Sequence, residues 1–457
     1  MADLPDSNAA DSKAADSKAG APAPRRDGRG PSRPTPASVL RSTRRALADP
    51  RTVGVAQALP RTAAFLVGRW RHRDLREEAG DAGGGVGETL GLAAQVLLDE
   101  VVISAMRNPK LYPHGDDYEK AGADIAAARA MWEAEGWLAD PESYHTDPGL
   151  PSDASVYSER VMGQRYERLC FQSRYSPREG EPGRERWLAH RLNRTAHAYV
   201  KRHPGAPRPW LVCIHGFGMG RAPMDLRAFR VHHLHHQLGM NLLLPVLPLH
   251  GPRQEPGADR GEGLMSINLI DSLHGMAQAA SDVRATIRWI QQVQPGAPIG
   301  IYGISLGGYV TALTASLEAD LSCAIAGIPA VDMPDLFRRH SPPYVKRRAL
   351  ATGALGPATD EVMSVVSPLA LAPKVKEGRR YVFAGIGDRL SSSDQARRLW
   401  EHWGRGPIAW YPGGHIGFFW TGRVSRFLDQ AAYDSGLTSE PPAPLEADLP
   451  SPEVPSL

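Results

Sequence analysis

Cysteine is scarce in this sequence: the 457 residues contain only Cys170, Cys213 and Cys323. So small and odd a number does not build a disulfide framework, and we therefore predict a reducing, cytoplasmic location. No run of 18 apolar residues occurs, so we expect no membrane-spanning helix. The first ten residues are acidic and polar, so we expect no secretory signal, which would be basic and then apolar.

Neither sign of charge dominates. The chain has 53 Lys and Arg against 50 Asp and Glu, for a net charge of +3. Such a balance provides no basic field for a polyanion, so we expect no nucleic-acid partner. With 46 Gly and 40 Pro the chain is neither collagen-like nor of low complexity, and its 42% hydrophobic content suffices for a substantial core.

Composition divides the chain into four segments. We expect residues 1–40 and 437–457, which are rich in Pro and small polar residues, to be disordered. Residues 41–150 predict a helical extension, with helices near 88–106 and 116–138 and an Arg-rich amphipathic stretch within 41–77. That stretch either packs on the main domain or lies on a membrane surface. Residues 151–436 form the predicted main domain.

Strand-like runs alternate with helical ones from about residue 155 onward. Apolar runs such as LVCIH and IGIYGIS do not alternate with polar residues, which is typical of strands covered on both faces. The pattern predicts an α/β fold with a mostly parallel, doubly wound sheet of eight strands. We expect strands near 165–174, 196–203, 209–215, 240–247, 298–304, 321–328, 379–386 and 407–411, and helices near 222–238, 268–293, 307–318, 393–404 and 417–434.

The segment from Gly303 to Gly307, GISLG, carries the strongest chemical signal. The bare pattern G-x-S-x-G is weak, but here an apolar strand runs into Ser305 and a helix runs out of it. A serine on so sharp a turn is held in a strained conformation with its hydroxyl exposed, and the flanking glycines relieve crowding. The context predicts Ser305 as a nucleophile, and the alternative is a Gly-rich structural turn.

A serine nucleophile needs a base, a residue that orients the base, and donors for the developing oxyanion. His415, in YPGGHIGFFW after a strand, is the candidate base. Asp388 follows the strand YVFAGIG and is the candidate orienting acid, while Asp332, after AIAGIPAV, is its rival. The chain order of serine, acid and histidine is that of the G-x-S-x-G hydrolases.

Candidate oxyanion donors lie in HGFGMG, which follows the strand PWLVCI. Backbone N–H groups of this run can turn toward the serine, and we predict the N–H groups of Phe217 and Leu306 as the pair. A dinucleotide-binding alternative fails, because the G-x-G-x-x-G spacing is missing and no acidic residue ends the next strand.

Over residues 155–435 the chain resembles the α/β-hydrolase superfamily. The resemblance rests on HGFGMG, on GISLG, on the pair Gly387-Asp388 and on GGH at residues 413–415. It implies a hydrolase that needs no cofactor and no metal, and a lid inserted near residues 333–372. It also implies these roles: nucleophile Ser305, base and then acid His415, orienting acid Asp388, oxyanion donors Phe217 and Leu306, and supporting residues His215, Gly216, Gly303 and Gly307.

Two further features have alternative interpretations. The run of histidines from His232 to His236 is either a zinc site or an ordinary histidine-bearing helix face. The expected lid interleaves apolar and basic residues, so it is either a cap for an anionic amphiphile or a solvated surface. Its basic residues are Arg338, Arg339, His340, Lys346, Arg347 and Arg348.

These observations together predict a serine hydrolase that cleaves carboxylic esters of small molecules or lipids through an acyl-enzyme. PVLPLHGPR, residues 245–253, is similar to a run in a branch of intracellular hydrolases with suspected lipid substrates. The alternatives are an acyltransferase or thioesterase that uses the same serine, and a catalytically silent scaffold. Peripheral contact with a membrane and the oligomeric state stay open.

Overall fold

The structure is a computed structural model that describes residues 56–71, 90–106, 112–258, 261–266 and 268–442. The predicted disorder of residues 1–40 falls outside these ranges, as do parts of the 41–150 extension and residues 443–457 of the tail. The described residues all belong to one compact unit, Ala48–Leu457. No helix among them is long and apolar enough to cross a membrane.

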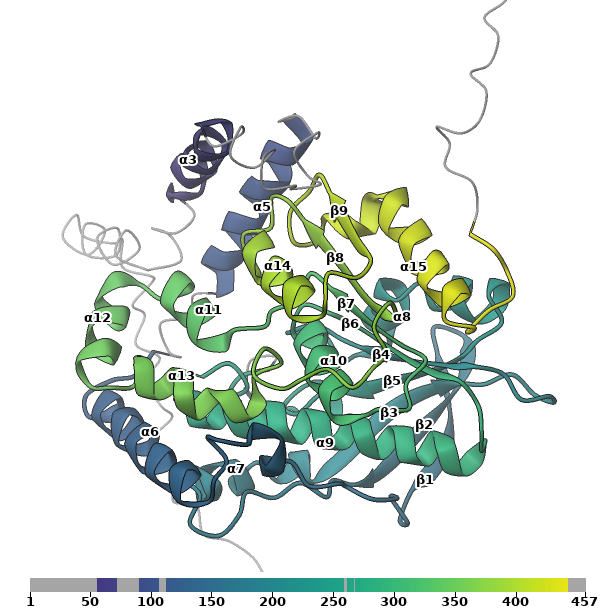
Figure 1. Cartoon of the computed structure of the whole chain (residues 1–457), viewed down its shortest axis with the longest axis horizontal. Helices are drawn as coiled ribbons and strands as arrows, with labels where there is room; N and C mark the ends of the chain where they lie inside the picture. The colour runs from purple at the N-terminus through teal and green to yellow at the C-terminus, as the bar shows by residue number, and fades with distance from the viewer. Residues whose placement is uncertain (1–55, 72–89, 107–111, 259–260, 267, 443–457) are drawn as a thin grey trace, which may run out of the picture. The chain divides into compact units, whose positions relative to one another are not determined.

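A nine-stranded mixed sheet forms the centre of this unit (Figure 1), in the order β1-β2-β3-β5-β4-β6-β7-β8-β9. The three strands at one edge pair antiparallel, and the others pair parallel from β5 to β9. The strands are β1 (Ser155–Val161), β2 (Gln164–Gln172), β3 (Thr195–Lys201), β4 (Trp210–Ile214), β5 (Asn241–Val246), β6 (Ile299–Ile304), β7 (Cys323–Gly327), β8 (Arg380–Gly385) and β9 (Ile408–Tyr411).

The predicted α/β-hydrolase fold is confirmed, but the sheet has nine strands and not eight. The additional strand, β1, forms a hairpin with β2 through a two-residue turn at Met162 and Gly163, both of which have positive φ. Two positive φ values in a two-residue loop define a type I′ turn, which suits the twist of a hairpin. The prediction missed β1 because most of its side chains are exposed, so no apolar face marks it.

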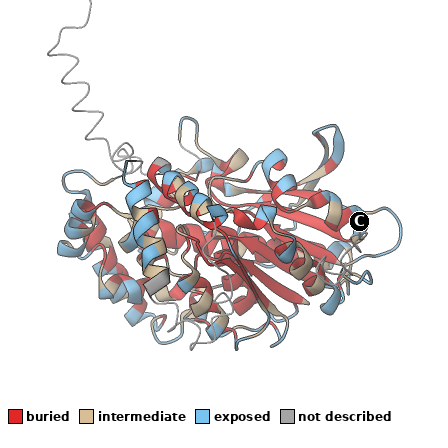
Figure 2. Ribbon diagram, turned by 90° about the horizontal axis from the view of Figure 1, so that it is seen from above, coloured by how far each residue is buried: buried red, intermediate tan, exposed pale blue. Residues whose placement is uncertain are grey.

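Helices cover both faces of the sheet. On one face lie α9 (Leu269–Val293), α10 (Leu306–Leu317) and α14 (Ser393–His402), with α6 (Asp117–Ala134) packed against α9, and on the other face lie α8 (Ala222–Ala228) and α15 (Gly422–Asp434). Side chains of the central strands alternate between the two resulting cores, and Figure 2 shows these strands buried beneath the helices. Every residue of β4, β6 and β7 is buried, as their unbroken apolar runs predict.

Two predicted helices differ from the observed ones. The helix expected at 222–238 ends at Ala228 and is followed by a π-helical turn, η4 (His233–Gln237). Arg230, between the two, has a positive φ, which breaks the α-helical path. The helix expected at 417–434 is divided into a 3-10 turn, η7 (Gly417–Trp420), and α15.

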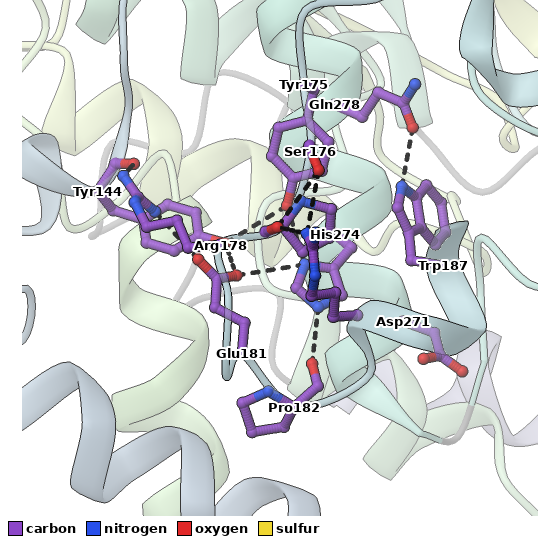
Figure 3. A network of polar contacts seen from close by, with 12 residues as sticks. Tyr144, Tyr175, Ser176, Arg178, Glu181, Pro182, Trp187, Asp271, His274 and Gln278 are labelled. Atoms are coloured by element: carbon purple, nitrogen blue, oxygen red, sulfur yellow. Dashed lines mark hydrogen bonds and ion pairs between the residues drawn. The ribbon is translucent and has the colours of Figure 1, made fainter. Parts of the chain in front are cut away.

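A buried polar network joins the segment that precedes β3 to helix α9 (Figure 3). His274 of α9 contacts the Tyr175 hydroxyl through Nδ1 and the Pro182 carbonyl through Nε2, each at 2.8 Å. Glu181 accepts from the Tyr144 hydroxyl at 3.1 Å and pairs with Arg178. Because these buried polar groups form hydrogen bonds with one another, the loss of their hydration is compensated, and the segment before β3 is held against α9.

Candidate active site

Ser305 sits on the sharp turn between β6 and α10. Its φ of 56° and ψ of −116° are strained for a residue with a side chain. The neighbouring glycines make the turn sterically possible: a Cβ at Gly303 would overlap the Gly307 carbonyl, and one at Gly307 would overlap the Ile214 carbonyl. The GISLG segment thus forms the strand-to-helix elbow expected from the sequence.

The structure brings Ser305, His415 and Asp388 together, although they follow three different strands. Nε2 of His415 lies 2.9 Å from Oγ of Ser305, and its Nδ1 lies 2.7 Å from Oδ2 of Asp388. The carboxyl ends of β6, β8 and β9 lie along one edge of the parallel sheet, which is why residues 110 and 27 positions apart in the sequence meet. The geometry lets His415 accept the serine proton while Asp388 holds the imidazole.

Asp388, and not its rival Asp332, contacts the histidine. The other oxygen of Asp388, Oδ1, accepts from the backbone N–H groups of Leu390 and Ser391, each at 2.9 Å, so the carboxylate is fixed at both oxygens. Asp332 lies elsewhere: it caps α11 (Met333–His340) and pairs with Arg398 at 2.9 Å.

The surroundings of His415 favour its protonated form. Burial by itself lowers the pKa of this imidazole, but the charge of Asp388, the hydrogen bond to it and the charge of Asp99 outweigh burial. The pKa of His415 is therefore raised above 6.5. An imidazole whose pKa is raised in this way is suited to take up the hydroxyl proton of Ser305 as the serine attacks.

The predicted oxyanion loop passes beside Ser305. A Cβ built on Gly216 would lie 3.5 Å from the Cβ of Ser305, which places the loop after β4 directly against the serine. Leu306 is the first residue of α10, where backbone N–H groups have no partner within the helix. The amides of Phe217 and Leu306 thus belong to the two segments that border the serine hydroxyl.

Two neutral histidines hold this loop. Nε2 of His215 accepts from the Leu247 N–H at 3.0 Å, and Nε2 of His250 accepts from the Gly218 N–H at 3.1 Å. Burial lowers the pKa of His250 to about 4, so its ring stays neutral and able to accept at physiological pH. The sequence analysis named His215 but missed His250, which lies in PVLPLHGPR.

Helix α5 (Leu90–Met106) of the N-terminal extension also reaches the site. Its Asp99 accepts from the backbone N–H groups of His415 at 2.8 Å and Arg389 at 3.0 Å. The sequence analysis missed this contact. A signal was present, because Asp99 and Glu100 are the only charged residues of this apolar helix, and they fall at helical spacing from the buried Leu92, Val96 and Ile103.

In its described residues the structure gives no support to the zinc-site alternative for the histidine run from His232 to His236. Within the described ranges, no group of three or more His, Cys, Asp and Glu side chains could hold a metal ion. His235 instead stacks on His203 with ring centroids 3.8 Å apart, and its Nδ1 contacts the Met240 carbonyl.

Residues 333–372 form the helices α11, α12 (Pro343–Ala351) and α13 (Pro357–Met363). Much of the positive charge in this segment is neutralised by carboxylates. Arg338 pairs with Asp360 at 2.9 Å, Arg339 with Asp335 at 2.6 Å and Arg348 with Glu119 at 3.3 Å. The pairing argues against a free cationic surface for an anionic amphiphile and favours the solvated-surface alternative.

Solved structures with a similar fold include an esterase and a peptidase. Acetyl xylan esterase 1 from Thermoanaerobacterium sp. JW/SL YS485 is 16% identical, with a TM-score of 0.42, over 61% of this chain and 88% of that chain. An acylaminoacyl peptidase of Pyrococcus horikoshii is 13% identical, with a TM-score of 0.35, over 60% of this chain and 39% of that chain. At such TM-scores the likeness leaves the activity open.

Two curated relatives from Mycobacterium tuberculosis are much more similar in sequence, whereas no family model matches the chain. The uncharacterized protein MT2702 of strain CDC 1551 / Oshkosh is 40% identical over 354 residues, which cover 77% of this chain and 84% of the relative. The uncharacterized protein Rv2627c of strain ATCC 25618 / H37Rv is 39% identical over the same lengths. The chain therefore belongs to the family of these two proteins, and its sheet and its serine elbow are those of the α/β-hydrolase fold.

Proposed function

We propose that the protein is a serine hydrolase that cleaves carboxylic esters through an acyl-enzyme, with Ser305, His415 and Asp388 as its catalytic residues. One observation carries the proposal: the hydroxyl of a strained elbow serine lies 2.9 Å from a buried imidazole, which in turn lies 2.7 Å from a buried carboxylate. A strained serine with this pair of partners is suited to nucleophilic attack and has no evident structural purpose.

The reaction would proceed in two halves. Oγ of Ser305 attacks the ester carbonyl carbon as its proton passes to Nε2 of His415, and the carbonyl oxygen becomes an oxyanion. The bond to the alcohol then breaks, and the alcohol leaves with the proton from Nε2. Water attacks the acyl-serine and gives a proton to His415, which returns it to Oγ as the carboxylic acid departs.

The N–H groups of Phe217 and Leu306 would stabilise the oxyanion in both halves. Backbone donors are effective here because they are held in place before the charge develops, and loss of one such donor costs about 3–4 kcal/mol of the barrier. The hydrogen bonds of His215 and His250 to neighbouring main-chain groups support this role, since they fix the loop that carries Phe217.

The proposal is tested by ester turnover in matched variants. p-Nitrophenyl esters of increasing acyl length would be assayed with the wild type, Ser305→Ala, His415→Ala and the control Ser322→Ala, which changes a half-buried serine just before β7. We expect turnover by the wild type and the control, and a loss of at least about 10³-fold in kcat for the two site variants.

The acyl acceptor is identified in the same assay by product analysis with added alcohols. Free acid as the main product supports hydrolysis, whereas ester of the added alcohol as the main product would make the protein an acyltransferase. Turnover that persists in Ser305→Ala would contradict the assignment of the nucleophile. No turnover and no reaction with any serine-directed probe would favour a silent scaffold.

A further inference from the structure

We propose that Asp99, on helix α5 of the N-terminal extension, is a positioning residue. It fixes the main chain of two loops relative to each other: the histidine loop, which follows β9 and carries His415, and the acid loop, which follows β8 and carries Asp388. This inference rests on the proposed function, because it concerns the same His415 and Asp388. Asp99 itself touches no reacting atom, so its effect reaches the chemistry only through the backbone on either side of it.

A single oxygen of Asp99 makes both contacts. Oδ2 accepts from the N–H of His415 at 2.8 Å and from the N–H of Arg389, the residue after Asp388, at 3.0 Å. The shared acceptor therefore ties the loop after β9 to the loop after β8 through one atom. Hydrogen bonds to an ionised carboxylate are among the strongest that a protein makes.

The preceding turn of α5 adds a further bond to the same loop. Oε1 of Gln95 accepts from the N–H of Gly414 at 3.0 Å, so consecutive turns of the helix bind consecutive amides of the histidine loop. Glycine is needed for this approach: a Cβ at Gly414 would lie 2.8 Å from Oδ2 of Asp99, and one at Gly417 would overlap Oε1 of Gln95.

The neighbouring carboxylate anchors the helix to the acid loop. Glu100 pairs with Arg389 at 2.9 Å and with Arg61 of α3 (Ala58–Arg71) at 3.6 Å. Arg389 therefore contacts α5 twice, by its side chain through Glu100 and by its amide through Asp99. Asp388, which holds the imidazole, lies one residue before this doubly anchored position.

Stability alone does not explain a carboxylate in this place. Asp99 is 1% exposed, and burial together with repulsion by Asp388 raises its pKa to about 6, although His415 and the two amides partly compensate. Such a desolvated acid next to a second acid costs folding free energy. Its presence here is explained if the hydrogen bonds keep the imidazole within bonding distance of both Ser305 and Asp388.

The test compares removal of the acceptor with removal of the charge. Asp99→Ala removes both hydrogen bonds, whereas Asp99→Asn keeps a carbonyl oxygen that accepts from both amides. No hydrogen bond within the described chain ends on Oδ1 of Asp99, so the amide NH₂ would displace no partner. Ile103→Ala, one turn further along the buried face of α5, controls for general loosening of the helix.

Assays would be run on the full chain, at a pH on the plateau of the wild-type profile. We expect kcat of Asp99→Ala to fall about 10–100-fold with KM changed less than about 3-fold, because a displaced base misaligns proton transfer without removing substrate contacts. Asp99→Asn and Ile103→Ala are expected to stay within about 5-fold of the wild type. Equal losses in Asp99→Asn and Asp99→Ala, or in Ile103→Ala and Asp99→Ala, would overturn the proposal.

A second measurement does not depend on turnover. The proton between Nδ1 of His415 and Asp388 gives a downfield ¹H NMR signal, which we expect in the wild type and Asp99→Asn and expect to weaken or vanish in Asp99→Ala. An unchanged signal in Asp99→Ala would refute the positioning role even if no ester were cleaved. If Asp99→Ala does not fold, Gln95→Ala against Gln95→Glu repeats the comparison, and equal signals in those two would refute the role for the helix.

Discussion

At the scale of single residues, the site depends on three side chains whose environments differ. Ser305 is strained by its backbone, Asp388 is fixed at both carboxylate oxygens, and His415 is buried between them. The electrostatic balance at His415 is the property most open to measurement, because two carboxylates, Asp388 and Asp99, raise its pKa against the effect of burial.

We predict that kcat/KM rises with pH through a pKa above 6.5. In the proposed mechanism His415 accepts the serine proton only when it is neutral, and its pKa is raised above 6.5, so activity is expected to be lost as the pH falls through its pKa. Asp99→Asn removes one of the negative charges that raise this pKa and is expected to move the acid limb to lower pH. The pH profile of ester turnover measures both.

Glu133→Gln provides the matched control, since it neutralises an exposed acid on α6 and is expected to leave the acid limb in place. An acid limb centred at or below 6.5 in the wild type would contradict the account of His415. A shift of the limb to higher pH in Asp99→Asn would contradict the role given to the Asp99 charge.

Sequence reasoning found the residues whose type and local context are both distinctive. Ser305 lies in a G-x-S-x-G turn between a strand and a helix, and Asp388 and His415 each follow a late strand. It missed Asp99 and His250, because their roles arise from contacts with main-chain groups of distant segments. A hydrogen bond from a backbone amide to an aspartate 316 positions away has no pattern in the sequence.

At the scale of elements, the strands were predicted well where both faces are buried. β4, β6 and β7 have unbroken apolar runs and were found within a few residues of their bounds, whereas the exposed edge strand β1 was missed. The helix expected over 222–238 stops early because the chain takes a positive φ at Arg230, which no local residue preference announces.

The loop after β5 is the element that fixes the oxyanion loop, through His250. We predict that His250→Phe lowers kcat about 10–100-fold with little change in KM, because it keeps the ring that packs on Phe217 but removes the acceptor of the Gly218 N–H. Displacement of that loop would misplace the N–H of Phe217, the proposed oxyanion donor. Steady-state kinetics with the ester that the wild type cleaves best measures the effect.

His232→Phe is the control, since it makes the same change at an exposed histidine. If His250→Phe kept the wild-type kcat, the loop would not need this hydrogen bond, and the assignment of Phe217 as a donor would lose its support.

At the scale of the whole molecule, a buried arginine ties separate segments together behind the oxyanion loop. The guanidinium of Arg253 donates to the carbonyls of Val246, at the end of β5, and Asn193, before β3, and pairs with Asp282 of α9 at 2.8 Å. Arg253 belongs to the same short segment as His250, so the packing of the domain and the position of the oxyanion loop are connected.

We predict that Arg253→Met lowers the free energy of unfolding by about 3–5 kcal/mol, because it leaves the buried carboxylate of Asp282 without its counter-charge. Urea unfolding followed by tryptophan fluorescence measures the change. The double variant Arg253→Met/Asp282→Leu removes both charges and is expected to be less destabilised than the single variant. A single variant as stable as the wild type would show that the pair does not hold these segments.

The N-terminal extension is also joined to the domain that carries the candidate site. The sequence analysis treated residues 41–150 as a separate extension, and the structure shows α5 bonded to the loops that carry His415 and Asp388. Its contribution could not be predicted because amphipathic periodicity shows which face of a helix is buried but not against which segment.

The central claim, that Ser305 is the nucleophile activated by His415, is tested most directly by locating a covalent adduct. The full chain would be treated with a fluorophosphonate, digested and analysed by mass spectrometry. We predict a single modified residue, Ser305, with labelling abolished in Ser305→Ala and slowed strongly in His415→Ala. An adduct at another residue, or equal labelling of Ser305→Ala and the wild type, would contradict the account.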